Sequence, residues 1–429
     1  MHIFAGMATM SQSPVEHAAK VLRMFEIEPA PLDRLLGSYL KKRRDLNSRQ
    51  RRLTAKAVYG WARWRRRLEG VLSQAGVRKP TFKQLAELYL RNHPCEDLER
   101  EGGSIAFDPA LDGVDMNSAS PERFPGGRAA FCSYPDFLYG MLEGDYGAQG
   151  AVELALALNE PLGPTLRVNT LKASRDEAVA LLDAGGVHAR PTEFSQFGLR
   201  LSIRADLRAS RAFKEGLVEL QDEGSQLAAL ASGAREGMRV LDACAGAGGK
   251  ALAMAQLMGD GGEIVACDVD AAKLGELKRR AQRAGVRSIR TADADDVLRE
   301  GGSFEIVFID APCSGTGTLR RAPDIKWRVS EEAIEDHAKS QRSLLRDYSR
   351  LVKPGGSLVY ATCSVLRLEN EDVVRDFVGA NGFSIQSVEE NLKGAGALCD
   401  GLITEEGFLR TDPRLGDWDG MFAACIVRT

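Results

Sequence analysis

The sequence has few of the residues that metal and disulfide sites require. It contains five histidines, and its cysteines include no pair separated by two residues and no spacing typical of metal ligands. This scarcity argues against a zinc site and against a triad based on histidine, so we expect no metal. In a reducing compartment, scattered thiols are either buried small hydrophobic side chains or reactive groups. The eight cysteines are Cys95, Cys132, Cys244, Cys267, Cys313, Cys363, Cys399 and Cys425.

Long apolar runs are also absent. No stretch approaches the roughly 20 uncharged apolar residues of a membrane span. The first residues, "MHIFAGMATMSQSP", lack a basic start followed by an apolar run, so we expect no secretory signal. With 44% apolar and 27% charged residues, the composition is that of a globular protein long enough for two or three cores. We expect a cytoplasmic monomer with no membrane contact.

An excess of positive charge is missing overall but present locally. The net charge of −3 argues against a uniformly basic nucleic-acid coat, yet residues 41–67 hold twelve Lys or Arg and the single acid Asp45. Such a cluster can contact several phosphates, or it can be an ordinary solvated helix face. The segment by itself leaves both interpretations open.

Hydrophobic periodicity divides the chain into four parts. Apolar residues at three and four spacing predict helices in the first part, with Asn47 or Ser48 capping the longest helix, and a segment rich in Gly, Pro, Asp and Ser follows. Short helices and strands then alternate, and the last part repeats a strand and helix rhythm. The predicted parts are an all-helical domain (12–96), a linker or irregular segment (97–130), a small α+β subdomain (131–222) and an α/β domain (223–429).

The α/β domain is predicted to contain a mostly parallel, Rossmann-like sheet. Its strands are near-continuous apolar runs, as in "MRVLDA", "GEIVACD", "SIRTAD", "FEIVFIDAP", "GSLVYATCS" and "MFAACIVR". Runs of this kind with intervening helices indicate a sheet that is covered on both faces. Ligands of such sheets bind beyond the carboxyl ends of the strands.

A glycine-rich turn and three acids fall at these strand ends. The turn "CAGAGGK" joins a strand to a helix, and Lys250 lacks the Ser or Thr of a phosphate-binding P-loop. Asp268, Asp293 and Asp310 end the next three strands, a pattern that suits the cationic ligand S-adenosylmethionine better than a dinucleotide. For Asp293 the alternative is a cap of the following helix.

Two cysteines follow apolar strands directly. Cys313 lies in "DAPCSGTG" and Cys363 in "YATCSV". A thiolate is strongly nucleophilic and is also a good leaving group. The residues by themselves allow either cysteine to be the nucleophile.

The motifs "CAGAGGK", "DAPCSGTGTLRRAPDIKWR" and "YATCSVLRLENE" resemble those of the RNA 5-methylcytosine methyltransferases of the RsmB/Nop2/Sun family. "PLGPTLRVNTLK" and "VELQDEGSQLAA" resemble the segment that precedes the family's catalytic domain. The basic helical part is similar to the NusB-like N-terminal domain of the bacterial RsmB type. The resemblance implies a Rossmann-like S-adenosylmethionine-dependent domain that methylates cytosine C5 in RNA, with 16S ribosomal RNA as the favoured substrate.

The resemblance also implies roles for individual residues. Cytosine C5 becomes nucleophilic after a thiolate adds to C6, and the family pattern makes Cys363 that nucleophile and Cys313 the residue that assists release. Asp310 would hold the N3 and amino edge of the base, and Lys250 is a candidate cation beside the thiolate. The implied cofactor residues are Cys244, Ala245, Gly246, Ala247, Gly248, Gly249, Lys250, Asp268, Asp293 and Asp310.

The chain departs from the family pattern at Ala247, where the family usually has proline. We expect a less rigid cofactor loop there. Beside the catalytic loop, Arg320, Arg321 and Lys326 are predicted to contact phosphates. Trp327 is predicted either to stack on a base or to be part of the core.

Other functions stay open or are excluded by pattern. The same chemistry could act on transfer RNA, or the chain could be a catalytically silent RNA-binding factor of ribosome assembly. The two cysteines, with Lys250 and Asp310, speak against a silent factor. A DNA cytosine methyltransferase would carry a single Pro-Cys nucleophile together with a Glu-Asn-Val segment, and the sequence lacks this combination. A thiol oxidoreductase would carry a C-x-x-C pair, and the sequence has none.

Overall fold

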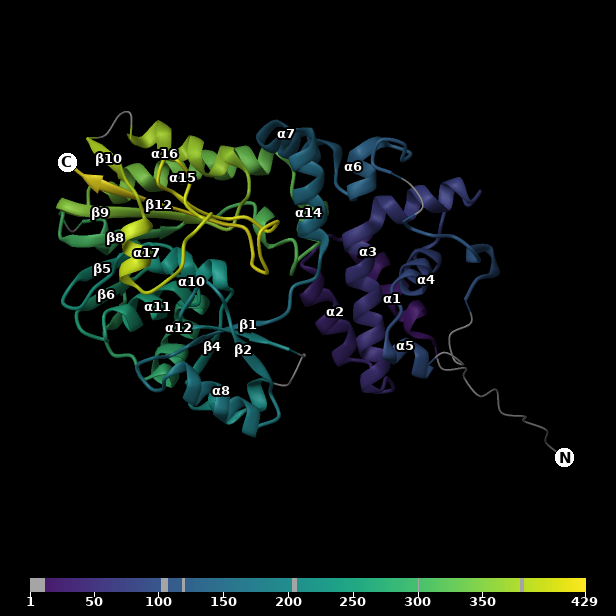
Figure 1. Cartoon of the computed structure of the whole chain (residues 1–429), viewed down its shortest axis with the longest axis horizontal. Coiled ribbons are helices and arrows are strands. Elements are labelled where there is room, and N and C mark those ends of the chain that lie inside the picture. The colour runs from purple at the N-terminus through teal and green to yellow at the C-terminus, as the bar shows by residue number, and fades with distance from the viewer. Residues whose placement is uncertain (1–11, 102–106, 118–119, 203–206, 300, 379–381) are drawn as a thin grey trace. The chain divides into compact units, whose positions relative to one another are not determined.

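The computed structural model describes residues 12–101, 107–117, 120–202, 207–299, 301–378 and 382–429. The chain forms two compact units, coloured along the chain in Figure 1. One, which we call the helical unit, consists of Met1–Asn159 together with Ala322–Val329. The other, which we call the sheet unit, consists of Glu160–Arg321 and Ser330–Thr429. Each unit is described separately.

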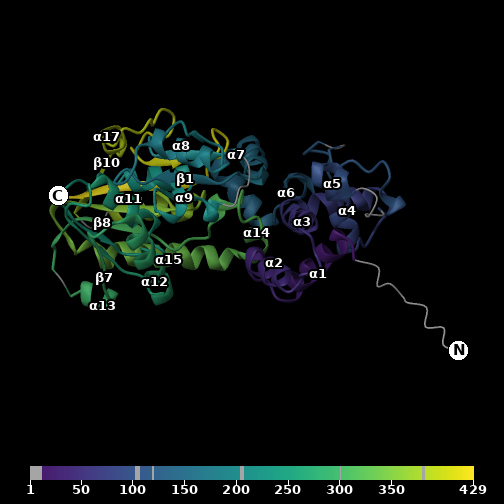
Figure 2. The ribbon, with the colours of Figure 1, turned by 90° about the horizontal axis from the view of Figure 1, so that it is seen from below.

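The helical unit confirms the helices predicted in the first part of the chain (Figure 2). Asn47, and not Ser48, caps the longest helix, because its side chain accepts a hydrogen bond from Gln50 N at 2.8 Å. Trp61 of this helix is fully buried and packs edge-on against Phe25 and Phe82. The elements are α1 (Pro14–Ile27), α2 (Leu32–Lys41), α3 (Ser48–Gln74), α4 (Phe82–Asn92), α5 (Glu96–Glu101), η1 (Pro109–Leu111), α6 (Gly127–Cys132), α7 (Asp136–Asn159) and α14 (Ile325–Arg328).

The sheet unit begins with a small antiparallel sheet. Its strand order is β2-β3-β1-β4, and Leu166, Leu199 and Val218 form part of its buried core. In the structure α7 belongs to the compact helical unit, whereas the sequence pattern placed it in this α+β subdomain. The elements are β1 (Thr165–Val168), α8 (Arg175–Ala184), β2 (Ala189–Pro191), β3 (Gly198–Leu201), η2 (Leu207–Ala209), α9 (Arg211–Lys214) and β4 (Val218–Leu220).

The large sheet has the order β10-β12-β9-β8-β5-β6-β7, with β11 paired to β12. The pairs among β5 to β9 are parallel, and β12 runs antiparallel to β9. The strands are β5 (Arg239–Asp242), β6 (Glu263–Ala266), β7 (Ile289–Thr291), β8 (Phe304–Asp310), β9 (Val352–Thr362), β10 (Phe383–Gln386), β11 (Leu409–Thr411) and β12 (Met421–Arg428). The six predicted strands are confirmed, and the pattern missed the short β10 and β11.

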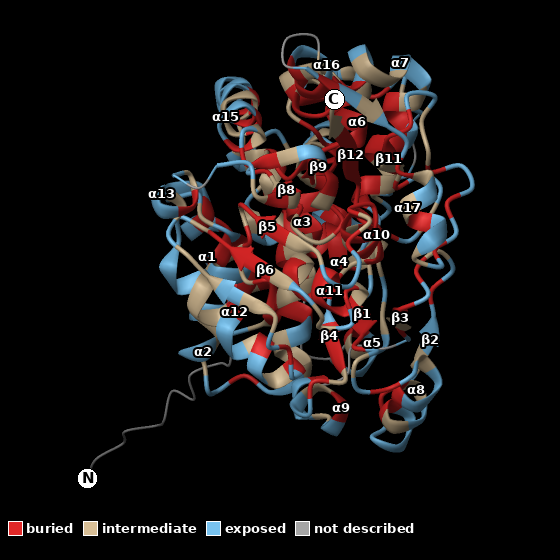
Figure 3. Cartoon of the chain, turned by 90° about the vertical axis from the view of Figure 1, so that its left-hand side faces the viewer, coloured by how far each residue is buried: buried red, intermediate tan, exposed pale blue. Residues whose placement is uncertain are grey.

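Helices cover both faces of this sheet, as its apolar strands predicted (Figure 3). Val240 and Ile306 pack with α10, α11 and α12, while Leu241 and Val307 pack with α15 and α16. Because both faces are filled, the carboxyl ends of the strands are where a ligand can bind. The helices and turns are α10 (Glu223–Leu230), α11 (Gly249–Leu257), α12 (Ala271–Ala284), α13 (Ala294–Val297), η3 (Thr316–Thr318), α15 (Glu331–Ser349), η4 (Arg367–Glu369), α16 (Glu371–Val378) and α17 (Glu389–Gly394).

Candidate active site

Cys313 and Cys363 meet at the carboxyl edge of the large sheet. Their Sγ atoms lie 3.4 Å apart, and both side chains are partly buried. β8 and β9 are neighbouring parallel strands in which Asp310 pairs with Ala361, so the loops that carry the two cysteines leave the sheet side by side. A tertiary contact between neighbouring strands therefore joins two residues that are far apart in sequence.

Gly317 lets the loop of Cys313 approach the loop of Cys363 closely. Its N–H donates to Cys363 O at 2.9 Å, and its own carbonyl accepts from Gly420 N at 2.8 Å. A Cβ atom on Gly317 would lie 1.9 Å from Gly420 O. Only glycine fits at this position without moving the backbone.

Charged neighbours distinguish the two thiols. Lys250 Nζ donates to Asp310 Oδ2 at 2.6 Å. Burial lowers the pKa of the Lys250 ammonium, but the charges of Asp310 and of a thiolate at Cys363 outweigh burial and raise it. The pKa of the Cys313 thiol is raised well above its usual value by its hydrogen bond to Cys363, by burial and by the Glu369 carboxylate. These neighbours favour a protonated thiol at Cys313.

The glycine-rich turn leads from β5 into α11. Gly248 adopts a left-handed conformation, with φ of 82°, directly before the first residue of α11. Ala247 O accepts a hydrogen bond from Arg280 at 2.7 Å, and Glu219 forms ion pairs with both Arg280 and Arg283. The expected loss of rigidity at Ala247 is therefore opposed by a side-chain contact from α12, which the sequence pattern did not reveal.

Asp268 lies just beyond β6 and ties the loops at this edge together. One carboxylate oxygen accepts from Gly246 N at 2.8 Å and the other accepts from Asp270 N at 2.8 Å. Val269 beside it is fully exposed, which is unusual for a large apolar side chain. Asp293 is exposed and caps α13 by accepting from Asp295 N at 2.9 Å. The structure therefore shows Asp293 as a helix cap, which was the alternative prediction for this residue.

Asp242, the last residue of β5, is a candidate site residue that sequence reasoning missed. It is fully buried, and neither carboxylate oxygen has a hydrogen-bond partner of good geometry among the described residues. Burial, with Asp310 nearby, raises the pKa of Asp242 to about 8. Its place directly before "ACAGAGGK" was the signal that could have identified it. The free thiol of Cys244 next to it has a raised pKa because of burial and the charges of Asp242 and Asp310.

Replacing Asp242 by asparagine should change how stability depends on pH. The ordinary aspartate value is 3.8, so between about pH 4 and pH 8 the folded state holds a proton that the unfolded state has lost. Stability of the ligand-free protein therefore falls as pH rises through this window, by up to about 1.4 kcal/mol per pH unit, and is level above it. Asp242→Asn stays neutral at every pH. We expect wild type and variant to have similar melting temperatures at pH 4 and the variant to melt at a higher temperature at pH 9. Equal differences at both pH values would contradict a buried, protonated Asp242.

The expected phosphate contacts of Arg320, Arg321 and Lys326 are wrong as stated, because all three side chains bind protein groups. Arg320 is buried and donates to Gly416 O and Glu160 O. Arg321 pairs with Asp222 at 2.6 Å and with Asp419 at 2.8 Å. Lys326 is fully buried in the helical unit, where its Nζ donates to the acceptors Arg63 O, Ser133 O and Asn159 Oδ1.

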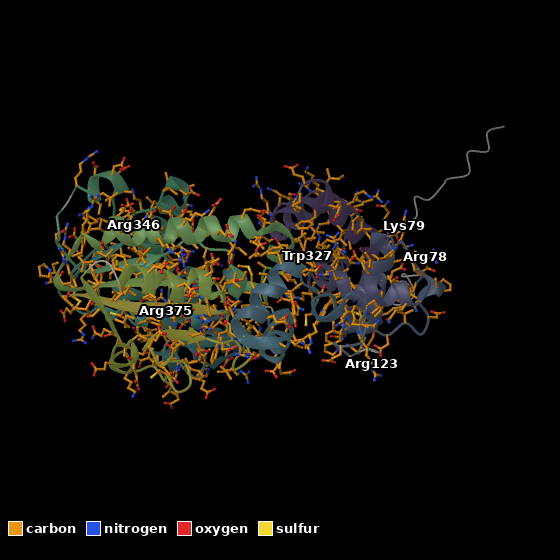
Figure 4. The ribbon with its side chains drawn as sticks, turned by 90° about the horizontal axis from the view of Figure 1, so that it is seen from above. Arg78, Lys79, Arg123, Trp327, Arg346 and Arg375 are labelled. Atoms are coloured by element: carbon orange, nitrogen blue, oxygen red, sulfur yellow. The ribbon has the colours of Figure 1, made fainter. Side chains whose placement is uncertain are left out.

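Trp327, labelled in Figure 4, is half-buried in the helical unit, which lies between its two predictions of a core residue and a base-stacking ring. Its indole Nε1 donates to Ala62 O at 2.7 Å, and the Arg65 guanidinium lies over its ring at 5.5 Å from the centroid. Its hydrogen-bond donor is therefore used inside the helical unit, in contrast to a ring held free for a base.

The basic segment 41–67 offers fewer free cations than its composition suggests. Several arginines serve the fold: Arg51 donates to the carbonyls of Leu40 in α2 and Leu46 beyond it, Arg67 is buried against Phe131, and Arg52 pairs with Asp97. Among the described residues, the exposed cations that form no ion pair include Lys41, Lys42, Arg44, Arg78, Lys79 and Arg123, the last three labelled in Figure 4.

The described residues contain neither a metal-binding cluster nor a membrane-spanning helix. Over the described ranges, no group of three or more His, Cys, Asp or Glu side chains has a geometry that could hold a metal ion. In the same ranges, no helix combines the length and the apolar character needed to cross a membrane.

Comparison with known proteins decides the family. Residues 229–427 match the model of the 16S rRNA methyltransferase RsmB/F family, and residues 134–208 match its ferredoxin-like domain. The ribosomal RNA small subunit methyltransferase B of Pseudomonas putida is 31% identical over 96% of this chain and 97% of that protein. The chain belongs to the RsmB/F family. It therefore has the S-adenosylmethionine-dependent methyltransferase fold with a ferredoxin-like domain before it.

Other similar proteins match over shorter spans. A probable ribosomal RNA small subunit methyltransferase B of Bacillus subtilis is 34% identical, and the match spans 57% of this chain and 56% of that protein. The crystal structure of a methyltransferase homologue from Pyrococcus horikoshii is 27% identical, with a TM-score of 0.60, over 70% of this chain and 97% of that chain. The small antiparallel sheet corresponds to the ferredoxin-like domain of the family, since its strands β1 to β3 lie within the matched residues.

Proposed function

We propose that this RsmB/F protein methylates cytosine C5 in RNA, with 16S ribosomal RNA as its substrate and Cys363 as the nucleophile. The observation that carries the proposal is the contact between two thiols, 3.4 Å apart, beside the Lys250–Asp310 ion pair. A binding scaffold needs none of these groups, whereas a covalent cycle needs both a nucleophile and a second group that helps it leave.

The proposed cycle assigns one step to each of the four residues. The Cys363 thiolate, stabilised by Lys250, adds to cytosine C6, and Asp310 holds the N3 and amino edge while charge develops there. C5 would then take the methyl group from a sulfonium donor, whose sulfur–methyl bond breaks and leaves a neutral thioether. The proton on C5 passes to solvent, its electron pair restores the C5–C6 double bond, and the bond from C6 to Cys363 breaks. Cys313 assists this last step, because its S–H can donate to the departing sulfur 3.4 Å away.

The residues around the glycine-rich turn fit S-adenosylmethionine, which supplies the methyl group as a sulfonium cation. The ligand carries an ammonium and a sulfonium, and the buried carboxyl group of Asp242 has no hydrogen-bond partner of good geometry among the described residues. We assign cofactor binding to Asp242 in addition to the ten residues expected from the sequence. Val269 offers an exposed apolar surface beside Asp268, which suits the face of a purine ring. That ten-residue set is Cys244, Ala245, Gly246, Ala247, Gly248, Gly249, Lys250, Asp268, Asp293 and Asp310.

The helical domain of residues 12–96 is proposed to be NusB-like and to bind the RNA. Its support is the all-helical fold and the exposed cations Lys41, Lys42 and Arg44 at the end of α2, which form no ion pair with a described residue. The α+β subdomain of residues 131–222 is proposed to contribute to RNA binding as well. Because reactive base atoms are hidden in a stacked helix, the target cytosine has to be unstacked.

Bisulfite sequencing of total RNA tests the proposal. Cells that lack the protein should lose one or more 5-methylcytosine positions in 16S ribosomal RNA, and the wild-type protein should restore them. Restoration by Cys363→Ala would contradict the covalent mechanism. Loss of positions only in transfer RNA would select the same chemistry on that substrate, and loss of no position would favour a silent assembly factor.

A further inference from the structure

A buried carboxylate, Glu369, joins the two loops that carry the cysteines. It is fully buried at the end of η4, six residues after Cys363. Ser314, which follows Cys313, donates its backbone N–H at 2.8 Å and its hydroxyl at 2.5 Å to this carboxylate. Ser364, which follows Cys363, donates its hydroxyl at 2.6 Å. One side chain therefore holds the residue next to each thiol.

The groups around the Glu369 carboxylate are hydrogen-bond donors. The fourth donor is Gln341 Nε2 of α15, which lies 3.2 Å from Glu369 and also donates to Pro312 O at 2.9 Å. An ionised carboxylate only accepts hydrogen bonds, so donors from three other residues satisfy it without a cation. No ion pair to Glu369 is formed by any described residue.

The same arrangement places a negative charge on the side of Cys313 and a positive charge on the side of Cys363. The Glu369 charge is among the causes that raise the pKa of Cys313. The pKa of Lys250 is raised in part by charge on Cys363. Sequence reasoning left the choice between the two thiols to family resemblance. Electrostatic asymmetry gives a physical reason for that choice.

We propose that Glu369 is a positioning residue for the cysteine pair: it holds the two thiols in contact and keeps the proton on Cys313, so that Cys363 is the one that attacks. This role rests on the proposed function, since it matters to catalysis only if the two cysteines carry out the covalent cycle. Glu369 acts through Ser314 and Ser364 and does not itself need to touch the RNA.

Two substitutions separate its charge from its hydrogen bonds. Glu369→Gln keeps the shape and can still accept from Ser314 N and the hydroxyls, but it removes the charge. Glu369→Ala removes both. Glu390→Gln is the matched control, because Glu390 is exposed on α17. Methyl transfer should fall by about tenfold to a hundredfold in both Glu369 variants, with the S-adenosylmethionine KM unchanged.

Two readouts require neither RNA nor methyl transfer. The first is alkylation of Cys313 by iodoacetamide in a Cys363→Ser background across pH: adding Glu369→Gln should move the midpoint down by about one pH unit. The second is oxidation by diamide, in which the two thiols lose two electrons and two protons, an S–S bond forms, and the N=N bond of diamide is reduced to a hydrazine. Peptide mapping should show a Cys313–Cys363 disulfide forming about tenfold more slowly in Glu369→Ala than in wild type.

Either unchanged readout would overturn the proposal. If the alkylation midpoint does not shift in Glu369→Gln, the Glu369 charge does not keep the proton on Cys313. If the disulfide forms at the wild-type rate in a folded Glu369→Ala protein, Glu369 does not hold the two thiols in contact. If Glu369→Ala fails to fold, the Glu369→Gln variant still tests the proposal through the pH midpoint of Cys313 alkylation. Should wild type fail to methylate cytosine while both readouts respond as expected, the proposed function fails and the placement of the thiols by Glu369 stands.

Discussion

Cys363→Ala is expected to reduce methyl transfer to below about one thousandth of wild type, because the proposed cycle then lacks the nucleophile that adds to cytosine C6. Cys313→Ala is expected to behave differently, with an RNA adduct accumulating on Cys363. The reason is that Cys313 no longer donates its S–H to the sulfur that has to leave, 3.4 Å away. The measurement is a tritium-transfer assay together with denaturing gel electrophoresis of the protein–RNA mixture.

Cys95→Ala is the matched control for both variants. Cys95 is a partly buried free cysteine of the helical unit, and the hydrogen bonds recorded at this residue use its backbone carbonyl, which alanine retains. It should keep wild-type activity and form no adduct. An adduct in Cys363→Ala, with clean turnover in Cys313→Ala, would exchange the two roles.

Lys250→Met is expected to slow methyl transfer by roughly a hundredfold to a thousandfold, the usual effect of removing one preorganised charge from a water-poor site. Methionine keeps the length of the side chain but leaves Asp310 without its ion-pair partner and Cys363 without a nearby cation. Asp310→Asn should cost a similar factor. The double variant should lose less than the two factors multiplied, because the residues form one pair. Single-turnover kinetics with S-adenosylmethionine and RNA measure all three.

Lys353→Met provides the comparison for this pair. Lys353 pairs with Glu305 at 2.5 Å, and these residues lie near the amino ends of β9 and β8, the same two strands that end at the cysteines. Their pair is more exposed and remote from the thiols along both strands, so turnover should stay within about twofold of wild type. A rate for Lys250→Met as high as that of Lys353→Met would show that the Lys250 charge does not support the thiolate.

The main elements of the fold followed from local patterns. Period-3.6 apolar residues predicted α1 to α3, and continuous apolar runs predicted the strands that form the middle of the large sheet. β10 and β11 were missed because they are short, and their pairing with β12 depends on distant residues. Pattern analysis also could not place α7 or the segment Ala322–Val329 in the helical unit, because compactness depends on contacts across the chain.

The candidate site was predicted unevenly. Cys313, Cys363, Lys250 and Asp310 stand at strand ends or in the glycine-rich turn, positions that a parallel sheet brings to one edge. Arg320 and Lys326 stand in the same motif as Cys313, yet both are buried in protein contacts. A positive charge in a sequence shows only that a partner is needed, and whether that partner is a phosphate or a carbonyl group depends on the folded surroundings.

The sequence by itself determined the class of the sheet, the positions of both cysteines and the resemblance to a methyltransferase family. Those properties depend on side-chain type and short-range order, which can be read along the chain. Only the tertiary structure brought the thiols to 3.4 Å and placed Lys250 and Glu369 so that each cysteine has a different electrostatic environment. Coulomb interactions and buried hydrogen bonds depend on distance in space, and Glu369 is 55 residues from the Ser314 that it holds.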